Sequence, residues 1–215
     1  MSEAAARRYS GRSVQEWKAA RRERLLQAAL DLFGTDGYLP TSIERLCSQA
    51  KVSTRHFYQE FANKEAVLLA VYAELIELGI QRTADALTAA PAAPIGPRLT
   101  GAVSAYLETV MTDPRRARIS FVEVVGVSPA VEQRRLGFRE TLIQFVEYEG
   151  AAAVGRGEIE DRDFRFAGLA FIGAVNTLVY DWTLMDPRPP VDALETPLVE
   201  LATALLTGPV IAGPR

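Results

Sequence analysis

Three polar side chains with complementary chemistry fall on one face of a short helix predicted for residues 54–60. Thr54 and Tyr58 are four residues apart, and Arg55 shares their face. A guanidinium group can donate two parallel hydrogen bonds to O6 and N7 of guanine, and a phenol can donate to a phosphate oxygen. Phe57 and Phe61 point the other way, toward a core. This pattern is typical of a helix that reads base edges in DNA.

Polar residues on either side of this helix extend the predicted interface. Lys64 begins the next helix, where its ammonium group would add to the positive end of the helix dipole and anchor a phosphate. For Arg55 and Lys64 the alternative is a solvated surface charge, and for His56 it is no role at all. The complete predicted set of DNA-binding residues is Thr41, Ser42, Lys51, Ser53, Thr54, Arg55, His56, Tyr58 and Lys64.

Short helices must position these side chains. A first helix is predicted from Trp17 to about residue 33, because its apolar residues repeat at helical spacing along one stripe. Ser42 can cap a second helix over residues 43–50, and Ser53 can cap the third. Two very short helices joined by a tight turn form the layout that places a recognition helix in the major groove. Cys47 falls on the apolar side of the second helix and is predicted to be a core residue.

The distribution of charge supports a polyanionic partner at the N-terminal end. Residues 1–64 carry 11 Lys and Arg against 7 Asp and Glu, whereas residues 65–215 carry 13 against 20, within a net charge of −3. Attraction to phosphates acts locally, so a basic head on an acidic body remains compatible with DNA binding. Residues 1–16, which include Arg7, Arg8 and Arg12, are predicted to form a flexible basic arm.

Other functional classes lack the residues they need. The chain has one cysteine, Cys47, and one histidine, His56, and it contains no glycine loop of the kind that cradles phosphate. We therefore expect no enzymatic activity, no metal site, no cofactor and no intrachain disulfide. The apolar stretch 167–180 is shorter than a membrane span of roughly 18 residues. These features predict a cytoplasmic protein without a membrane partner.

The remainder of the chain is predicted to be helical and to hold a ligand. Three prolines interrupt the stretch 89–97, and helices are expected over about 98–111, 114–126, 129–153, 163–185 and 191–207. Aromatic side chains in these helices could line an apolar cavity for a largely hydrophobic small molecule, with an asparagine as a buried polar group. The residues predicted to line this pocket are Tyr106, Phe121, Phe145, Asn176 and Tyr180.

The last two predicted helices are apolar enough to form a dimer interface. The last carries a continuous leucine stripe, and the helix before it carries small residues that allow close approach of a partner helix. The alternative is that both pack only within their own chain. The residues predicted at the interface of a homodimer are Gly173, Leu194, Leu198, Leu201 and Leu205.

The N-terminal third carries an ordered set of short motifs: residues 24–33, Gly37-Tyr38, Thr41-Ser42-Ile43, Val52-Ser53, Phe57-Tyr58, Phe61 and Lys64-Glu65. In order and spacing these motifs resemble those of the TetR family of transcriptional regulators. Two positions depart from the usual pattern: Lys51 stands where many members have glycine, and Glu60 where many have histidine. The resemblance implies a nine-helix fold with three DNA-binding helices, a variable ligand-binding body and a dimer interface made by the last two helices.

Together these observations predict an all-α, TetR-like regulator of transcription. We expect an arm at residues 1–16, a helix-turn-helix domain at 17–64, and a ligand-binding and dimerisation domain at 65–215. The expected partners are double-stranded operator DNA, a second copy of the chain and a small-molecule effector that releases the repressor from its operator. The alternative is a helical adaptor that has kept the fold but binds protein in place of DNA.

Overall fold

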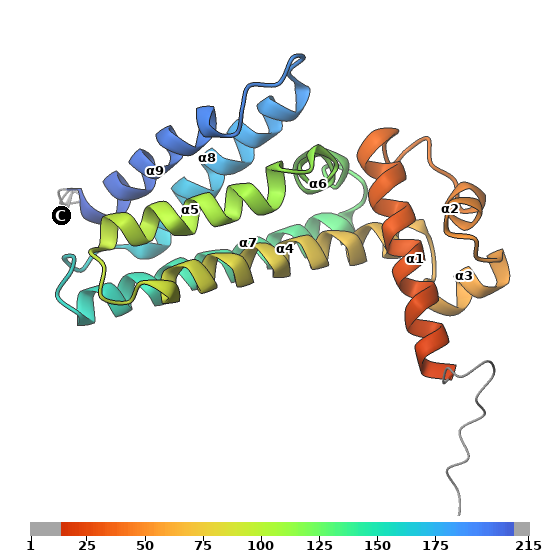
Figure 1. The fold of residues 1–215 in the computed structure, drawn as a ribbon, viewed down its shortest axis with the longest axis horizontal. Helices are drawn as coiled ribbons and strands as arrows, with labels where there is room; N and C mark the ends of the chain where they lie inside the picture. The colour runs from red at the N-terminus through yellow and green to blue at the C-terminus, as the bar shows by residue number, and fades with distance from the viewer. Residues whose placement is uncertain (1–13, 209–215) are drawn as a thin grey trace, which may run out of the picture. The chain divides into compact units, whose positions relative to one another are not determined.

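The computed structural model describes residues 14–208, and helices dominate this part of the chain (Figure 1). No strand occurs between residues 14 and 208. The helices are α1 (Val14–Thr35), α2 (Ile43–Ala50), α3 (Thr54–Glu60), α4 (Lys64–Ala89), α5 (Ile95–Met111), α6 (Pro114–Arg118), η1 (Ile119–Glu123, one turn of π-helix), α7 (Pro129–Gly155), α8 (Phe164–Leu184) and α9 (Asp192–Thr207). The all-α prediction is confirmed.

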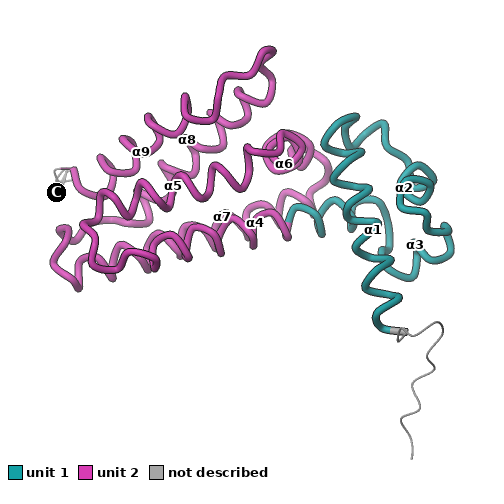
Figure 2. The backbone as a smooth tube through the Cα atoms, in the orientation of Figure 1, with its two compact units in different colours: residues 1–72 teal, residues 73–215 magenta. Residues whose placement is uncertain are grey.

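The chain divides into two compact units, unit 1 (Met1–Tyr72) and unit 2 (Ala73–Arg215), which Figure 2 shows in different colours. The division falls inside α4, whose first residues belong to unit 1 and whose remainder belongs to unit 2. No helix between residues 14 and 208 has both the length and the apolar character required to cross a bilayer.

The core of unit 1 forms where α1 packs against α2 and α3. Phe33 of α1, Leu46 of α2 and Phe57 of α3 are each completely buried. The ring of Tyr38 meets Phe33 edge to face, with 5.3 Å between the ring centroids. The predicted stripe on α1 is confirmed, because all five of its apolar residues are buried: Leu25, Ala28, Ala29, Leu32 and Phe33.

In unit 2, α8 packs against both α7 and α9, and α5 packs against α9. Facing side chains of α5, α6, η1, α8 and α9 form one apolar cluster, the unit 2 core, in which the ring of Trp182 and the side chains of Leu107 and Leu198 are buried. Full burial of such a side chain stabilises the fold by roughly 1.5–3 kcal/mol. The members of the unit 2 core are Val103, Leu107, Val110, Met111, Ala117, Phe121, Val175, Val179, Trp182, Leu198 and Ala202.

Local capping fixes where several helices begin. Pro114 and Pro129 occupy the first turns of α6 and α7, where a missing N–H group removes no helical hydrogen bond. Asp113 accepts a hydrogen bond from the backbone N–H of Arg115, and Ser128 accepts one from the backbone N–H of residue 131. Both caps follow the expectation from sequence.

Three predicted boundaries differ from the structure. Residues 14–16, assigned to the flexible arm, form the first turn of α1, and Arg7, Arg8 and Arg12 lie outside the described residues. Helix α5 begins at Ile95, because Pro97 lies within its first turn, where proline is compatible with a helix. The single helix expected over 114–126 changes at residue 119 from α6 to the π-turn η1.

Candidate functional site

A short turn between α2 and α3 sets the direction of the candidate recognition helix. Ser42 Oγ accepts from Arg45 N at 3.2 Å, and Ser53 Oγ accepts from His56 N at 3.3 Å, so a serine caps each helix. Lys51 ends α2 in the left-handed region with φ 53°, and its N–H donates to backbone carbonyls of α2. Lysine thus adopts a conformation that glycine adopts at lower free-energy cost.

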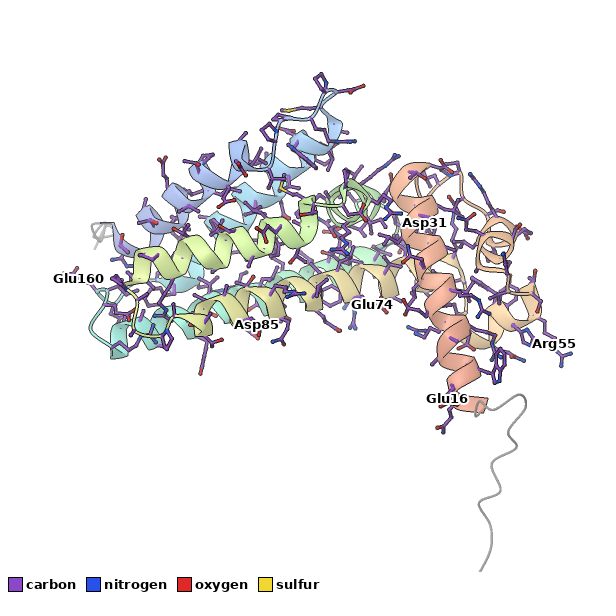
Figure 3. The ribbon with its side chains drawn as sticks, in the orientation of Figure 1. Glu16, Asp31, Arg55, Glu74, Asp85 and Glu160 are labelled. Atoms are coloured by element: carbon purple, nitrogen blue, oxygen red, sulfur yellow. The ribbon has the colours of Figure 1, made fainter. Side chains whose placement is uncertain are left out.

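The outer face of α3 presents the predicted base-reading side chains to solvent. Thr54, Arg55 and His56 are exposed, and Tyr58 is 57% exposed. Figure 3 shows Arg55 projecting away from the helix. The inner face is anchored by Phe57, whose ring packs edge to face against Tyr58 with 5.3 Å between the centroids. The structure therefore brings the hydroxyl, the guanidinium and the phenol together on one accessible helix.

The structure gives His56 and Ser53 a local role at the start of α3. His56 Nδ1 lies 3.0 Å from Ser53 Oγ, and the same hydroxyl oxygen accepts from the His56 backbone. Both residues are exposed, so this contact leaves their outer surfaces accessible. Ser42 and Lys51 are exposed as well.

Thr41 corrects one of the predicted DNA contacts. Its side chain is only 1% exposed, and its hydroxyl donates to the carbonyl of Gly37 at 2.7 Å. The hydroxyl donates its hydrogen bond inside the loop between α1 and α2, so the side chain is not available to DNA. It holds the loop in shape.

The structure also contradicts the predicted phosphate contact of Lys64. Its ammonium group donates to the carbonyls of Tyr38 at 2.7 Å, Thr41 at 2.8 Å and Leu39 at 3.3 Å, and Nζ lies 4.1 Å from the centroid of the Tyr38 ring. An ammonium group has three donors, and all three are engaged. Burial lowers the pKa of Lys64. Lys64 therefore joins the loop between α1 and α2 to the start of α4, whereas the sequence predicted that it would bind a phosphate.

Three arginines of α1 position α2 and α3. Arg21 Nη2 pairs with the Glu60 carboxylate at 3.1 Å, and the side chain of Glu60 is only 1% exposed. Arg22 lies over the ring of Phe61, 4.5 Å from its centroid. Arg24 Nε donates to the carbonyl of Ala50 at 3.0 Å, which satisfies a carbonyl at the end of α2.

Sequence analysis did not identify these contacts, which join residues 26 to 39 positions apart. One signal was present: Glu60 is an acidic residue on a helix predicted to face phosphates, so it required a cationic partner.

Cys47 is buried as predicted, and burial raises the pKa of its thiol. A raised thiol pKa disfavours the reactive thiolate.

Two of the five residues predicted to line a ligand pocket meet in one apolar cluster: Phe121 belongs to the unit 2 core, and Tyr106 packs against it. The other three lie outside that core. Phe145 of α7 is half-buried. Asn176 and Tyr180 are exposed on α8, since neither α7 nor α9 covers that face within the chain. The prediction that Asn176 is a buried polar group is therefore wrong for the single chain.

The uncovered face of α8 is apolar over most of the helix. Phe166 is 65% exposed, and further exposed apolar residues on this helix are Leu169, Gly173, Tyr180 and Leu184. The polar residues Asn176 and Thr177 are exposed between Gly173 and Tyr180. A Cβ atom added at Gly173 would meet no atom within 4 Å. An apolar stripe of this length on one helix marks an interaction surface.

Helix α9 contributes less than predicted to such a surface. Leu198 is completely buried in the unit 2 core, and Leu194 packs against that core. Leu201 and Leu205 are half-buried. The leucine stripe is therefore covered in part by α5 and α8 of the same chain, and its place in a dimer interface stays a prediction.

Comparison with known proteins finds a family match in the N-terminal third of the chain and a relative over most of its length. Residues 25–71 match the family model described as bacterial regulatory proteins, tetR family. The fatty acid metabolism regulator protein of Bacillus subtilis (strain 168) is 21% identical over 178 residues, which cover 82% of this chain and 91% of that protein.

Solved structures share the fold along most of the chain. The transcriptional regulator FadR from B. subtilis, crystallised in complex with stearoyl-CoA, superposes with a TM-score of 0.75 at 20% identity, covering 86% of this chain and 98% of that one. The fatty acid degradation regulator FadR from Bacillus halodurans gives a TM-score of 0.77 at 18% identity, covering 87% and 95%. The helix-turn-helix geometry and the match to the tetR family of bacterial regulatory proteins coincide in residues 25–71, and the fold shared with these regulators extends over most of the chain.

Proposed function

We propose that this protein is a ligand-responsive transcriptional repressor that binds operator DNA as a homodimer. The observation that carries the proposal is the exposed face of α3, where Thr54, Arg55 and Tyr58 project from a helix whose opposite face is locked into the core. Arg55 provides the bidentate geometry that guanine recognition requires, and Tyr58 provides a phosphate donor. Because its operator would lie on the chromosome, the protein would act in the cytoplasm, and it would have no enzymatic activity.

A homodimer would give this helix its specificity. Two recognition helices about 34 Å apart read successive major-groove segments of a two-fold symmetric operator. The exposed stripe on α8, from Phe166 to Leu184, is the surface best suited to pair with its own copy. Gly173 lies near its middle, where the absence of a side chain would allow two helices to approach closely.

The dimer surface can be tested without disturbing the fold of the chain. Gly173→Arg should convert the dimer to a monomer in sedimentation experiments, because the new side chain has free space in one chain but would collide with a partner helix. Circular dichroism should show unchanged helix content. A Gly173→Arg protein that stays dimeric would show that this part of α8 is not at the interface.

The effector would be a long-chain acyl compound. One similar protein is a fatty acid metabolism regulator, and one similar structure is a fatty acid degradation regulator. The similar transcriptional regulator FadR of B. subtilis was crystallised with stearoyl-CoA. A hydrophobic effector also agrees with the aromatic and aliphatic side chains that form the unit 2 core. Binding would shift the population of dimers toward a spacing of recognition helices that does not fit the operator.

Thermodynamic linkage makes this mechanism testable, because the effector and the operator must lower each other's binding affinity by the same factor. Operator fragments would first be selected from the source genome with the purified protein. Stearoyl-CoA should then release a labelled fragment in fluorescence anisotropy, while free coenzyme A at the same concentration should not. Equal affinity for stearoyl-CoA with and without operator would contradict the mechanism. Failure to retain any fragment would favour the protein-binding adaptor.

A further inference from the structure

Helix α6 continues directly into η1, and the change of helical form occurs inside unit 2. The N–H of Ile119 donates to the carbonyls of both Arg115 and Arg116, after which one π-turn runs to Glu123. Isolated π-turns within helices occur frequently at functional sites. The residues on either side of Ser120, Ile119 and Phe121, are both buried.

Ser120 lies in this π-turn, and its hydroxyl has no hydrogen-bond partner among the described residues. The side chain is 6% exposed, and Oγ is shielded from solvent. In α1, α4, α5, α7, α8 and α9, Ser and Thr hydroxyls donate to the carbonyl four residues earlier. Thr109, which is equally buried, does so at 2.8 Å. A buried hydroxyl without a partner is uncommon and needs an explanation.

A second unsatisfied donor lies one helical turn before the first. Arg116 Nη1 donates to the carbonyl of Thr109 at 3.1 Å, but its Nε is buried and makes no hydrogen bond to a described residue. Its neighbours differ, because Arg115 pairs with Asp113 and Arg118 pairs with Glu123. No salt bridge links Arg116 to any residue between 14 and 208.

We propose that Arg116 Nε and Ser120 Oγ form the polar end of the effector site and together bind an acceptor oxygen at the head of a long acyl chain. Residues four apart on a helix share a face, so the two donors lie on the same side of this segment. Phe121, the residue after Ser120, and Met111 belong to the unit 2 core, whose apolar side chains are suited to methylene groups. The proposal rests on the acyl effector proposed above and assigns the residues that recognise its head group.

Two ligands offer this chemistry, the thioester carbonyl of an acyl-CoA and the carboxylate of a free fatty acid. The test therefore uses three probes: stearoyl-CoA, stearate, and S-octadecyl-CoA, a thioether in which a methylene group replaces the carbonyl. Dissociation constants would be measured by calorimetry for the full-length wild type, Ser120→Ala and Arg116→Lys. The matched control is Thr109→Val, which removes an equally buried hydroxyl that already has a partner.

The wild type should bind stearoyl-CoA roughly ten to a hundred times more tightly than the thioether, the range expected for two hydrogen bonds. Ser120→Ala should lose the share of that preference due to one hydrogen bond, roughly three- to tenfold, without losing thermal stability, because it removes an unsatisfied group. Arg116→Lys should weaken it, since lysine keeps the charge but lacks Nε. Thr109→Val should keep the full preference.

The possible failures are distinguishable. If Ser120→Ala retains the wild-type preference for the carbonyl, the assignment of the head-group site is wrong and the acyl effector stands. If the wild type binds stearate but neither coenzyme A derivative, the effector is the free acid, and the head-group site stands only if Ser120→Ala binds stearate more weakly than the wild type. If no probe binds while operator binding persists, both the acyl effector and this site are overturned.

Discussion

Removal of the Lys64 ammonium group tests whether this group stabilises the loop between α1 and α2 or binds a phosphate of DNA. Lys64→Met keeps most of the aliphatic stem but deletes the donors to the carbonyls of Tyr38 and Thr41, at 2.7 and 2.8 Å. A hydrogen bond to a charged group contributes about 1.5–3 kcal/mol, and the contact with the Tyr38 ring adds about 0.5–1 kcal/mol. Because the loop is only half-buried, we expect a total loss of about 2–4 kcal/mol in the free energy of unfolding of unit 1.

DNA binding would respond in a characteristic way. A lysine that neutralises a phosphate contributes about 0.9 to the slope of log K against log salt concentration. Since the three donors of Lys64 are engaged with carbonyls, Lys64→Met should lower affinity at every salt concentration and leave the slope unchanged. Arg55→Ala, on the exposed face of α3, is the comparison: loss of a phosphate contact would lower the slope by about 1, and loss of a base contact would relax sequence preference.

The assay is fluorescence anisotropy of a labelled operator between 50 and 200 mM salt, roughly the range over which phosphate contacts dominate the response. Urea unfolding followed by circular dichroism gives the stability of each variant. A Lys64→Met protein of wild-type stability whose salt slope falls by about 1 would refute the reasoning and restore the phosphate contact.

Three further predictions concern single contacts. Arg21→Met should cost about 2–4 kcal/mol in urea unfolding because it leaves the buried Glu60 carboxylate unpaired, and adding Glu60→Gln should recover part of the loss; additive effects would mean that the pair is not coupled. Gly150→Ala should lower the melting temperature of unit 2, at a cost of about 1–3 kcal/mol, because the new Cβ would lie 2.5 Å from the ring of Phe164; an unchanged transition would show that the ring moves aside freely. The hydrogen bond from Arg115 lowers the pKa of Asp113 below its usual 3.8, so this carboxylate stabilises the fold above that pH and loses its effect as the pH falls. Asp113→Asn should keep the cap but make stability less dependent on pH between about 3 and 5, and a wild-type acid response in that variant would exclude the linkage.

Local signals allowed much of the fold to be predicted. The pairs Asp113-Pro114 and Ser128-Pro129 marked the starts of two helices correctly, because capping and the missing proline N–H act within one turn. The apolar stripe on α1 marked its buried face. The face of α3 could be predicted for the same reason, since its sides follow from helical periodicity alone.

The remaining features depend on contacts between distant residues. Lys64 was assigned to a phosphate because the dipole of its own helix was the only partner visible in sequence, whereas the carbonyls that bind it lie 23 to 26 positions earlier. Leucine spacing on α9 identified a buried face, but spacing does not distinguish burial within a chain from burial against a partner. Leu198, which was predicted at the dimer interface, therefore lies in the core of its own chain.

The left-handed backbone of Lys51 has a consequence for how such a head can evolve. A residue other than glycine in that region raises the free energy of the fold by roughly 1–2 kcal/mol. The cation at the end of α2, three residues before α3 begins, therefore carries a penalty in stability. A chain that did not need this positive charge would gain stability from glycine at the same position, so the residue found there reflects a balance between charge and stability.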